Sequence, residues 1–120
     1  MRKNFGADVR IGHYAACFYI DGQVIEAALA KTGGKSENPD AFVKAIRSVT
    51  LPDTPRGPIS FDDHGNVVID VYVRRAVKQG DKMVNKTIKT YHKVSQFWKM
   101  NPAKFLAEPV FSRDYPPMKS

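Results

Sequence analysis

The longest apolar stretch of the chain runs from Ile11 to Gly34 and has the three- and four-residue spacing of a helix. One stripe is formed by Ile11, Tyr14, Ala15, Phe18, Gly22, Ile25 and Leu29. A second apolar set continues around the cylinder and comprises Cys17, Ile20, Val24, Ala27 and Ala28. Lys31 followed by Gly33 and Gly34 indicates the helix end, because a cation suits the last turn and glycine tolerates positive φ. We predict a helix that is covered on more than one side and forms the centre of the core.

A second helix is predicted after Asn38, which is a good N-cap residue. Pro39 stands at the first helical position and Asp40 in the first turn, where both are favoured. Its apolar stripe consists of Phe42, Val43, Ile46 and Val49. The short link that contains two glycines indicates that the two helices pack as a hairpin.

From Thr50 onward the periodicity changes from helical to extended. Prolines make residues 50–58 an irregular connector, and Ile59–Phe61 is a short strand. Alternation of apolar with mostly polar positions predicts a longer strand over Val67–Val77 with one buried face. The alternating apolar positions are Val67, Ile69, Val71 and Val73. A turn over residues 79–82 leads to a third strand over residues 83–92, so the fold class is α/β, with two packed helices followed by a β-hairpin system.

The tail is less regular but rich in aromatic side chains: Phe97, Trp98, Phe105, Phe111 and Tyr115. We expect a short helix from Asn101 through Leu106, then an extended segment over residues 108–117, with the tail packed onto a body. At the other end, residues 1–6 have the pattern of a last helical turn with nothing before it. We therefore expect that this sequence starts part-way through a longer protein.

The length of 120 residues predicts a single domain over residues 1–120, with a helical part (1–58), strands with a hinge crossover (59–93) and the tail (94–120). Lys and Arg number 19 against 12 Asp and Glu, which gives a net charge of +7. This charge favours anionic partners in general and is also typical of a solvated surface. No stretch has the length of a membrane span, and residues 1–4 lack the apolar run of a secretion signal.

The cysteine and histidine residues, which could act as metal ligands or in catalysis, are spaced far apart in the sequence. The single cysteine, Cys17, lies on an apolar helix face and is predicted to be a buried free thiol. His13, His64 and His92 match no zinc spacing and are expected at the surface or in turns. No nucleotide-binding or nucleophile motif is present. We therefore expect no catalytic residues, no metal and no cofactor, and not an enzyme.

Two short segments resemble ligand sites, but a hairpin turn and a helix end explain them better. Asp62, Asp63 and Asn66 match part of a calcium loop, yet the glycine is misplaced and no glutamate closes it, so a hairpin turn is favoured. The glycines at 33 and 34 follow a helix instead of opening one, so they indicate a helix end and not a phosphate cradle.

The charge also raises a basic nucleic-acid-binding module as an alternative function. The relevant residues are Arg74, Arg75, Lys78, Lys82, Lys86, Lys89 and Lys93, together with Tyr72 and Tyr91. These strands lack the aromatic-rich pattern of an RNA-recognition sheet, and outward lysines also protect strand edges. We therefore expect no nucleic-acid partner.

A family resemblance covers almost the whole chain. It is carried by Tyr14 to Ala16, Asp21 to Gly34, Asn38 to Phe42 with Ala45 to Arg47, Arg56 to Asn66, and Asp70 to Val73. These segments resemble the C-terminal portion of a branched-chain amino-acid-type (type 1) periplasmic solute-binding protein of an ABC importer. The ending from Phe111 to Pro117 is similar to the subgroup associated with aromatic acids.

The resemblance implies a partial lobe of a two-lobed α/β protein that traps an amino acid or aromatic carboxylate between lobes closing about a hinge. It implies a periplasmic location and an ABC-transporter permease as partner. Residues 50–58 and 75–82 are then hinge candidates. Because the start of the long helix approaches the cleft in this family, Tyr14 and Cys17 are predicted ligand-binding residues, with core packing as the alternative for both.

The main departure from the family is length, since its members are several times longer. A single part of the sheet leaves apolar faces and open strand edges. We therefore expect the chain to form a homo-oligomer when isolated, or to be a piece of a larger receptor that does not bind alone.

Overall fold

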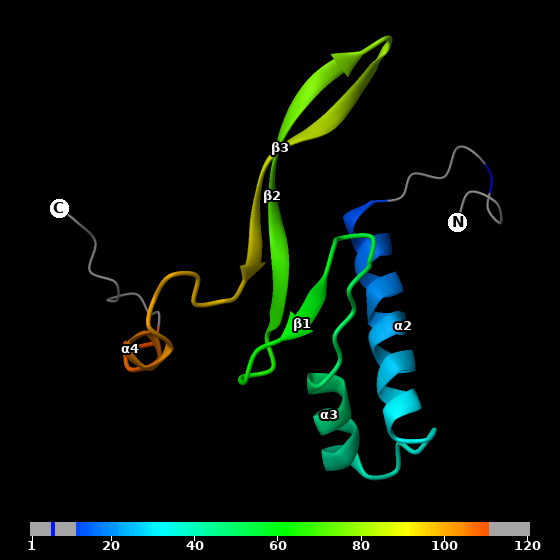
Figure 1. The fold of residues 1–120 in the computed structure, drawn as a ribbon, viewed down its shortest axis with the longest axis vertical. Helices are drawn as coiled ribbons and strands as arrows, with labels where there is room; N and C mark the ends of the chain where they lie inside the picture. Colours follow the sequence, from blue (N-terminus) through cyan, green and yellow to red (C-terminus); the bar gives the residue numbers. More distant parts are fainter. Residues whose placement is uncertain (1–5, 7–11, 111–120) are drawn as a thin grey trace.

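The computed structural model describes Gly6 and residues 12–110. Its elements in chain order are α2 (His13–Lys31), α3 (Pro39–Arg47), β1 (Ile59–Phe61), β2 (Val67–Gln79), β3 (Lys82–Val94) and α4 (Pro102–Leu106). Figure 1 shows the two longer helices side by side, the sheet beside them, and a hairpin that projects beyond both helices. The predicted α/β order of helix pair, hairpin system and tail is confirmed.

Local sequence rules account for the helix pair. At the end of α2 the chain passes through Gly33 and Gly34, whose φ angles are 62° and 81°. The side chain of Asn38 accepts a hydrogen bond from the Ala41 amide at 3.1 Å, and Pro39 is the first residue of α3. The predicted end of the first helix and the predicted cap and start of the second are confirmed, so the turn between the helices is fixed by local chemistry.

The core lies on one side of α2 only. Ile20, Val24 and Ala28 of α2 are buried and cluster with Val49 and Ile59. The stripe predicted first is largely exposed instead: Tyr14 is 78%, Phe18 74% and Ile25 48% accessible. The prediction that this helix is covered on more than one side is therefore wrong for the described chain. The second apolar set faces the sheet, and no described element covers the first.

The sheet is antiparallel throughout, with the order β1-β2-β3. Ile59 pairs with Ile69 at the start of β2, and Gln79 pairs with Lys82 across a two-residue turn. Gly80 in this turn has φ of 60°, a conformation that suits glycine. Both hairpin strands run further than predicted. Residues 75–82, predicted as a hinge candidate, form the end of this hairpin, and their hinge role stays a prediction.

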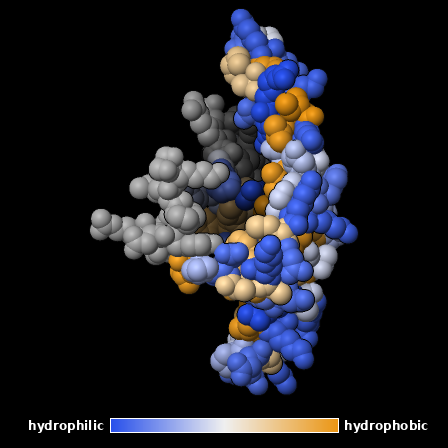
Figure 2. All heavy atoms as spheres, turned by 90° about the vertical axis from the view of Figure 1, so that its left-hand side faces the viewer, coloured by the Kyte–Doolittle hydropathy of each residue, from blue (hydrophilic) through white to orange (hydrophobic). Residues whose placement is uncertain are grey.

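The buried face expected for β2 is not formed by its valines. Val67, Val71 and Val73 are exposed, whereas Asp70 is buried. Two register shifts interrupt the pairing of β2 with β3, and core contacts reach β2 only as far as Ile69. Beyond that point the strands add no residue to the core cluster, and the view in Figure 2 shows a mainly hydrophilic hairpin surface.

The tail packs through aromatic rings, as expected for its described part. Phe97 is buried, and its ring centroid lies 5.3 Å from that of His64 and 5.6 Å from that of Phe105. Trp98 contacts Tyr91 with 5.2 Å between centroids. Phe111 and Tyr115, like the predictions for residues 1–5 and 7–11, lie outside the described residues. Within the described part, no helix is both long and apolar enough to cross a membrane.

Candidate ligand-binding site

The connector between α3 and β1 runs alongside α2 and then turns back into β1 (Figure 1). Arg56 in this connector lines the same depression as His13 and Ala16 at the start of α2. Leu51 and Ile59 exchange backbone hydrogen bonds of 2.9 and 2.8 Å, which close the loop. Inside it, the buried hydroxyl of Thr54 donates to the Gly57 carbonyl at 2.6 Å and accepts from the Arg56 amide at 3.1 Å. The position of Arg56 is therefore set by hydrogen bonds of the loop itself.

Among the described residues, the guanidinium group of Arg56 has no carboxylate partner. Arg56 is half-buried, and its Nη1 lies 3.7 Å from the Sγ of Cys17. Within residues 12–110, no Asp or Glu oxygen comes within ion-pair distance of it. The same sulfur lies 3.6 Å from Nε2 of His13. Among the described residues this half-buried cation has a weak sulfur acceptor and no carboxylate, so its guanidinium group could accept an anion.

An apolar hollow of about 180 Å³ adjoins this guanidinium between α2 and the start of the sheet. Its lining consists of Cys17, Ile20, Asp21, Val24, Arg56, Ile59, Phe61, Val67 and Ile69. Most of these side chains are hydrocarbon, and the two charged groups, Asp21 and Arg56, are the polar exceptions. The hollow can therefore take an apolar group whose charged end lies at Arg56.

A larger and more open depression, of about 680 Å³, lies on the other side of Arg56. It is lined by Gly12, His13, Ala16, Pro55, Arg56, Ile69, Asp70, Val71, Tyr72, Arg74 and Asn85. The N-terminus of α2 opens here with neither a side-chain cap nor an acidic residue in its first turn. The positive end of the helix dipole and the two arginines give this depression a positive potential.

Asp70 is the single acidic residue in this depression, and other groups already hold its carboxylate. Oδ1 accepts from the Lys93 amide at 3.0 Å, and Oδ2 lies 2.7 Å from Nδ1 of His92. The Lys93 hydrogen bond is the main cause that lowers the pKa of Asp70; desolvation acts against it, and His92 adds to the lowering. Asp70 therefore stays charged and is satisfied within the sheet.

The two predicted ligand-binding residues fall in different surroundings. Cys17 is half-buried and lines the apolar hollow beside Arg56, so it is more accessible than the buried thiol predicted. Tyr14 is on the exposed side of α2 and lines neither hollow. Their contact with a ligand stays a prediction. Sequence reasoning missed Arg56, although an arginine between two prolines and next to a glycine indicates a cation in a rigid loop.

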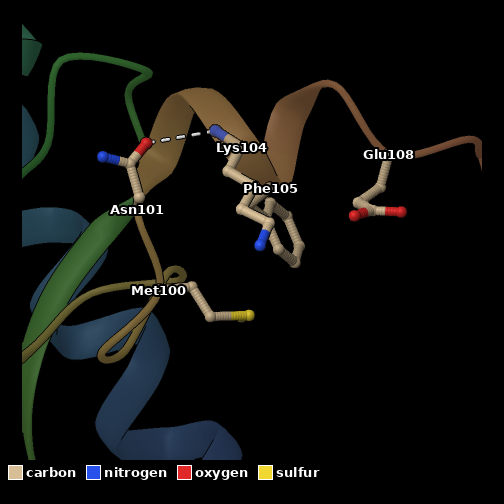
Figure 3. Close-up of a pocket in the computed structure, with 5 residues that line it drawn as sticks. All are labelled: Met100, Asn101, Lys104, Phe105 and Glu108. Atoms are coloured by element: carbon tan, nitrogen blue, oxygen red, sulfur yellow. Dashed lines mark hydrogen bonds between the residues drawn. The ribbon is translucent and has the colours of Figure 1, made fainter.

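A third depression, of about 350 Å³, lies at α4 and is shown in Figure 3. It is lined by Met100, Asn101, Lys104, Phe105 and Glu108. The side chain of Asn101 accepts from the Lys104 amide at 3.1 Å, which caps this short helix (Figure 3). All five residues come from one short segment, so this is a groove along a single helix and is set apart from the core.

The histidine, cysteine and acidic residues described by the structure form no group of three or more that could hold a metal ion. The segment with partial likeness to a calcium loop is a tight turn, in which Oδ1 of Asp62 accepts from the His64 and Asn66 amides at 3.0 and 2.9 Å. Desolvation tends to raise the pKa of Asp62, but these bonds and one from Gln96 lower it overall. The predicted hairpin turn is confirmed.

Solved structures similar to this chain are solute-binding proteins of ABC transporters. One, from Rhodopseudomonas palustris BisB5 in complex with 3,4-dihydroxybenzoic acid, is 30% identical with a TM-score of 0.69 over 86% of this chain and 26% of its own. A second from R. palustris, in complex with 4-hydroxybenzoate, is 30% identical with a TM-score of 0.57 over 66% of this chain and 21% of its own.

A third similar structure is an ABC transporter substrate-binding protein from Sphaerobacter thermophilus, 24% identical with a TM-score of 0.67, which supports the fold alone. It covers 76% of this chain and 24% of its own length. No family profile matches the chain, and no curated protein matches its sequence.

These likenesses confirm the family resemblance found in the sequence. The chain has the fold of part of an ABC-transporter solute-binding protein, and it spans about a quarter of the length of the similar structure described first. Two of the three structures described above hold aromatic acids. All three are transport proteins and not enzymes, and the nucleic-acid-binding alternative finds no support among them.

Proposed function

We propose that the chain is part of the extracytoplasmic solute-binding component of an ABC importer and that it binds a small aromatic carboxylate. A periplasmic location, a permease partner and a second lobe that closes over the solute belong to the same proposal. The aromatic acids held by two similar solved structures support this class of ligand. The chain then supplies one wall of the cleft, as the C-terminal portion of a receptor does.

The unpaired guanidinium group of Arg56 is the observation that carries the proposal. Arginine binds a carboxylate through two parallel hydrogen bonds, and such a pair is stronger where water is partly excluded. Arg56 is half-buried, and the sulfur of Cys17 at 3.7 Å is a poor acceptor that a carboxylate displaces easily. The start of α2 lies beside it and adds positive potential.

The apolar hollow beside Arg56 explains why an aromatic acid suits the site. Its volume of about 180 Å³ is similar to that of protein cavities of about 150 Å³ that hold benzene. Ile20, Ile59 and Phe61 supply walls on which a ring can pack. A ring in the hollow brings its carboxylate to the guanidinium group.

An aliphatic amino acid is the other ligand that the family resemblance implies. Its ammonium group requires an acidic partner, and Asp21 lines the same hollow as Arg56. Asp21 is exposed, however, so its interaction with an ammonium group is weakened by water. We therefore favour the aromatic acid over leucine, isoleucine or valine.

The proposal is tested by measuring ligand-induced thermal stabilisation of the chain. We expect 4-hydroxybenzoate and 3,4-dihydroxybenzoate to raise the melting temperature. We expect 4-hydroxybenzyl alcohol, which has the same ring without a carboxylate, to have no effect. Leucine and valine report on the amino-acid alternative in the same assay.

Two variants locate the site. Arg56→Gln removes the cation and should abolish the stabilisation, with a loss of about tenfold or more in affinity. Arg75→Gln on the hairpin is the matched control and should bind as the original chain does. Equal stabilisation by the alcohol, or unchanged binding by Arg56→Gln, would contradict this site. No response to any carboxylate up to millimolar concentration would contradict solute binding by this chain alone.

A further inference from the structure

The outer part of the β2–β3 hairpin, residues 74–89, concentrates the positive charge of the molecule. Its cations are Arg74, Arg75, Lys78, Lys82, Lys86 and Lys89. Its single acidic residue is Asp81. With six cations and one carboxylate, the segment has a net charge of +5. The whole chain has a net charge of +7. Most of the excess charge is therefore on one projecting hairpin.

These cations are not neutralised within the described chain. None of the six takes part in an ion pair there, and Arg75 pairs in register with Lys86. Like charges that face each other across two strands repel and destabilise the pair. A repulsive arrangement at the end of a hairpin is relieved when an anionic surface binds it.

Apolar side chains are exposed among the cations. Met83 is 66% and Ile88 is 51% accessible. Figure 2 shows the end of the hairpin as mainly hydrophilic with small apolar areas between. Cations surrounding a few exposed apolar side chains are typical of segments that lie at the interface of an anionic bilayer.

Among the described residues, no strand outside the hairpin pairs with its outer part. β1 pairs only with residues 67–69 of β2, and from residue 74 to residue 87 each paired residue of β2 and β3 has its partner within the hairpin. In Figure 1 the closed end of the hairpin lies beyond the helices. A bilayer can therefore contact this end without meeting the core.

The same segment is poorly suited to single-stranded nucleic acid. Residues 74–89 contain no aromatic side chain on which a base stacks. The nearest rings, Tyr72 and Tyr91, are at the base of the hairpin and lie under the cations Arg74 and Lys89, at 5.5 and 4.6 Å from the ring centroids. Of the large anionic partners, a lipid surface fits this end better.

We propose that residues 74–89 dock onto an anionic lipid surface. The lysines and arginines pair with phosphate groups of the lipid head groups, while Met83 and Ile88 enter the interface between head groups and acyl chains. This role is separate from solute binding in the apolar hollow, because the strand residues that line the hollow, Ile59, Phe61, Val67 and Ile69, all lie outside residues 74–89.

Co-sedimentation with lipid vesicles tests the proposal. We expect the chain to bind vesicles of phosphatidylcholine and phosphatidylglycerol in equal parts and not vesicles of phosphatidylcholine alone. Binding should fall steeply with added salt, because surface charges are screened over about a Debye length. Duplex and single-stranded DNA are measured under the same conditions.

Charge variants identify the surface. Lys82→Gln combined with Lys86→Gln should weaken vesicle binding about 30-fold, the effect expected for two basic residues at an anionic membrane. Lys35→Gln combined with Lys44→Gln removes the same charge from the helical part and should change binding much less. Met83→Ser tests the apolar contribution and should weaken binding at high salt as well.

Circular dichroism establishes that each variant keeps its fold, and the salt series on the unaltered chain provides a test that needs no variant. Equal binding to neutral vesicles would overturn the proposal. So would equal losses in the two double variants, or binding to DNA tighter than to the mixed vesicles.

Discussion

The ε-ammonium group of Lys31 donates hydrogen bonds to the backbone carbonyl oxygen and the hydroxyl oxygen of Ser48, at 2.7 and 2.8 Å. Lys31 is in the last turn of α2, and Ser48 is the C-cap of α3. The Lys31 side chain therefore provides a hydrogen-bond donor at the C-terminus of α3, where backbone carbonyl groups lack partners within their own helix.

We expect Lys31→Met to lower the free energy of unfolding by about 0.5–1 kcal/mol, since the bond is charge-assisted but exposed to water. Lys35→Met is the control, because no side-chain hydrogen bond of Lys35 is found in the described structure. Urea unfolding measures both. Equal midpoints for the two variants would show that the bond contributes nothing.

The carboxylate of Asp70 should make stability depend on pH. Its pKa is lowered from the ordinary value of 3.8 in the folded chain, mainly by the Lys93 amide. The stabilisation that the Asp70 carboxylate provides is therefore complete above about pH 4. It is lost as the pH falls through the lowered pKa of Asp70 in the folded chain. We expect Asp70→Asn to reduce the difference in unfolding free energy between about pH 6 and about pH 3.

Asp62 contributes in the same direction, so Asp62→Asn should also reduce this difference. Asp81→Asn, in the hairpin turn, is the control variant. Chemical unfolding at several pH values gives the result. If Asp70→Asn kept the full pH dependence of the unaltered chain, its carboxylate would have no such role.

Gly57 lies against the hydroxyl group of Tyr72 with φ of 90°. A side chain here is strained by the backbone angle and collides with the tyrosine oxygen. We expect Gly57→Ala to lower the free energy of unfolding by about 1–3 kcal/mol. Adding Tyr72→Phe should restore part of the loss, because it removes the colliding oxygen.

Gly22 is the control for this prediction. It lies inside α2, and an added methyl group there meets no atom within 4 Å apart from its chain neighbours and the backbone of its own helix. Gly22→Ala should therefore raise the free energy of unfolding by about 0.5–1 kcal/mol. Equal effects at the two glycines would contradict the proposed difference between them. Thermal unfolding of both variants measures it.

The exposed side of α2 should make the isolated chain self-associate, as expected from the sequence. Tyr14, Phe18 and Ile25 form much of this surface, and no described element covers it. We expect Phe18→Ser to reduce the average mass measured by light scattering. Leu106→Ser, which removes an exposed apolar side chain from α4, should not. A monomer at high concentration would contradict this prediction.

Features set by neighbouring residues were predicted well from the sequence. The cap at Asn38, the glycines that end α2 and the short helix after Asn101 each depend on contacts within a few positions, and all three are present. These features depend on residues that are close in the sequence and not on tertiary packing, so the sequence alone predicts them.

Some features set by packing were not predicted. Both sides of α2 are apolar, so periodicity alone does not indicate that Ile20 and Val24 face the sheet while Phe18 faces outward. The register shifts of the hairpin, which place the Asp70 carboxylate against His92 and Lys93, have no clear mark in the sequence. The candidate site beside Arg56 was not predicted because its residues come from separate elements.

The loop that carries Arg56 is closed by Thr54 and bounded by Pro55 and Pro58. Because this backbone is already ordered, a solute that reaches the guanidinium group loses little of its binding free energy to freezing the loop. Association at this site should therefore be fast and carry a small entropic penalty, and calorimetry can measure that penalty directly.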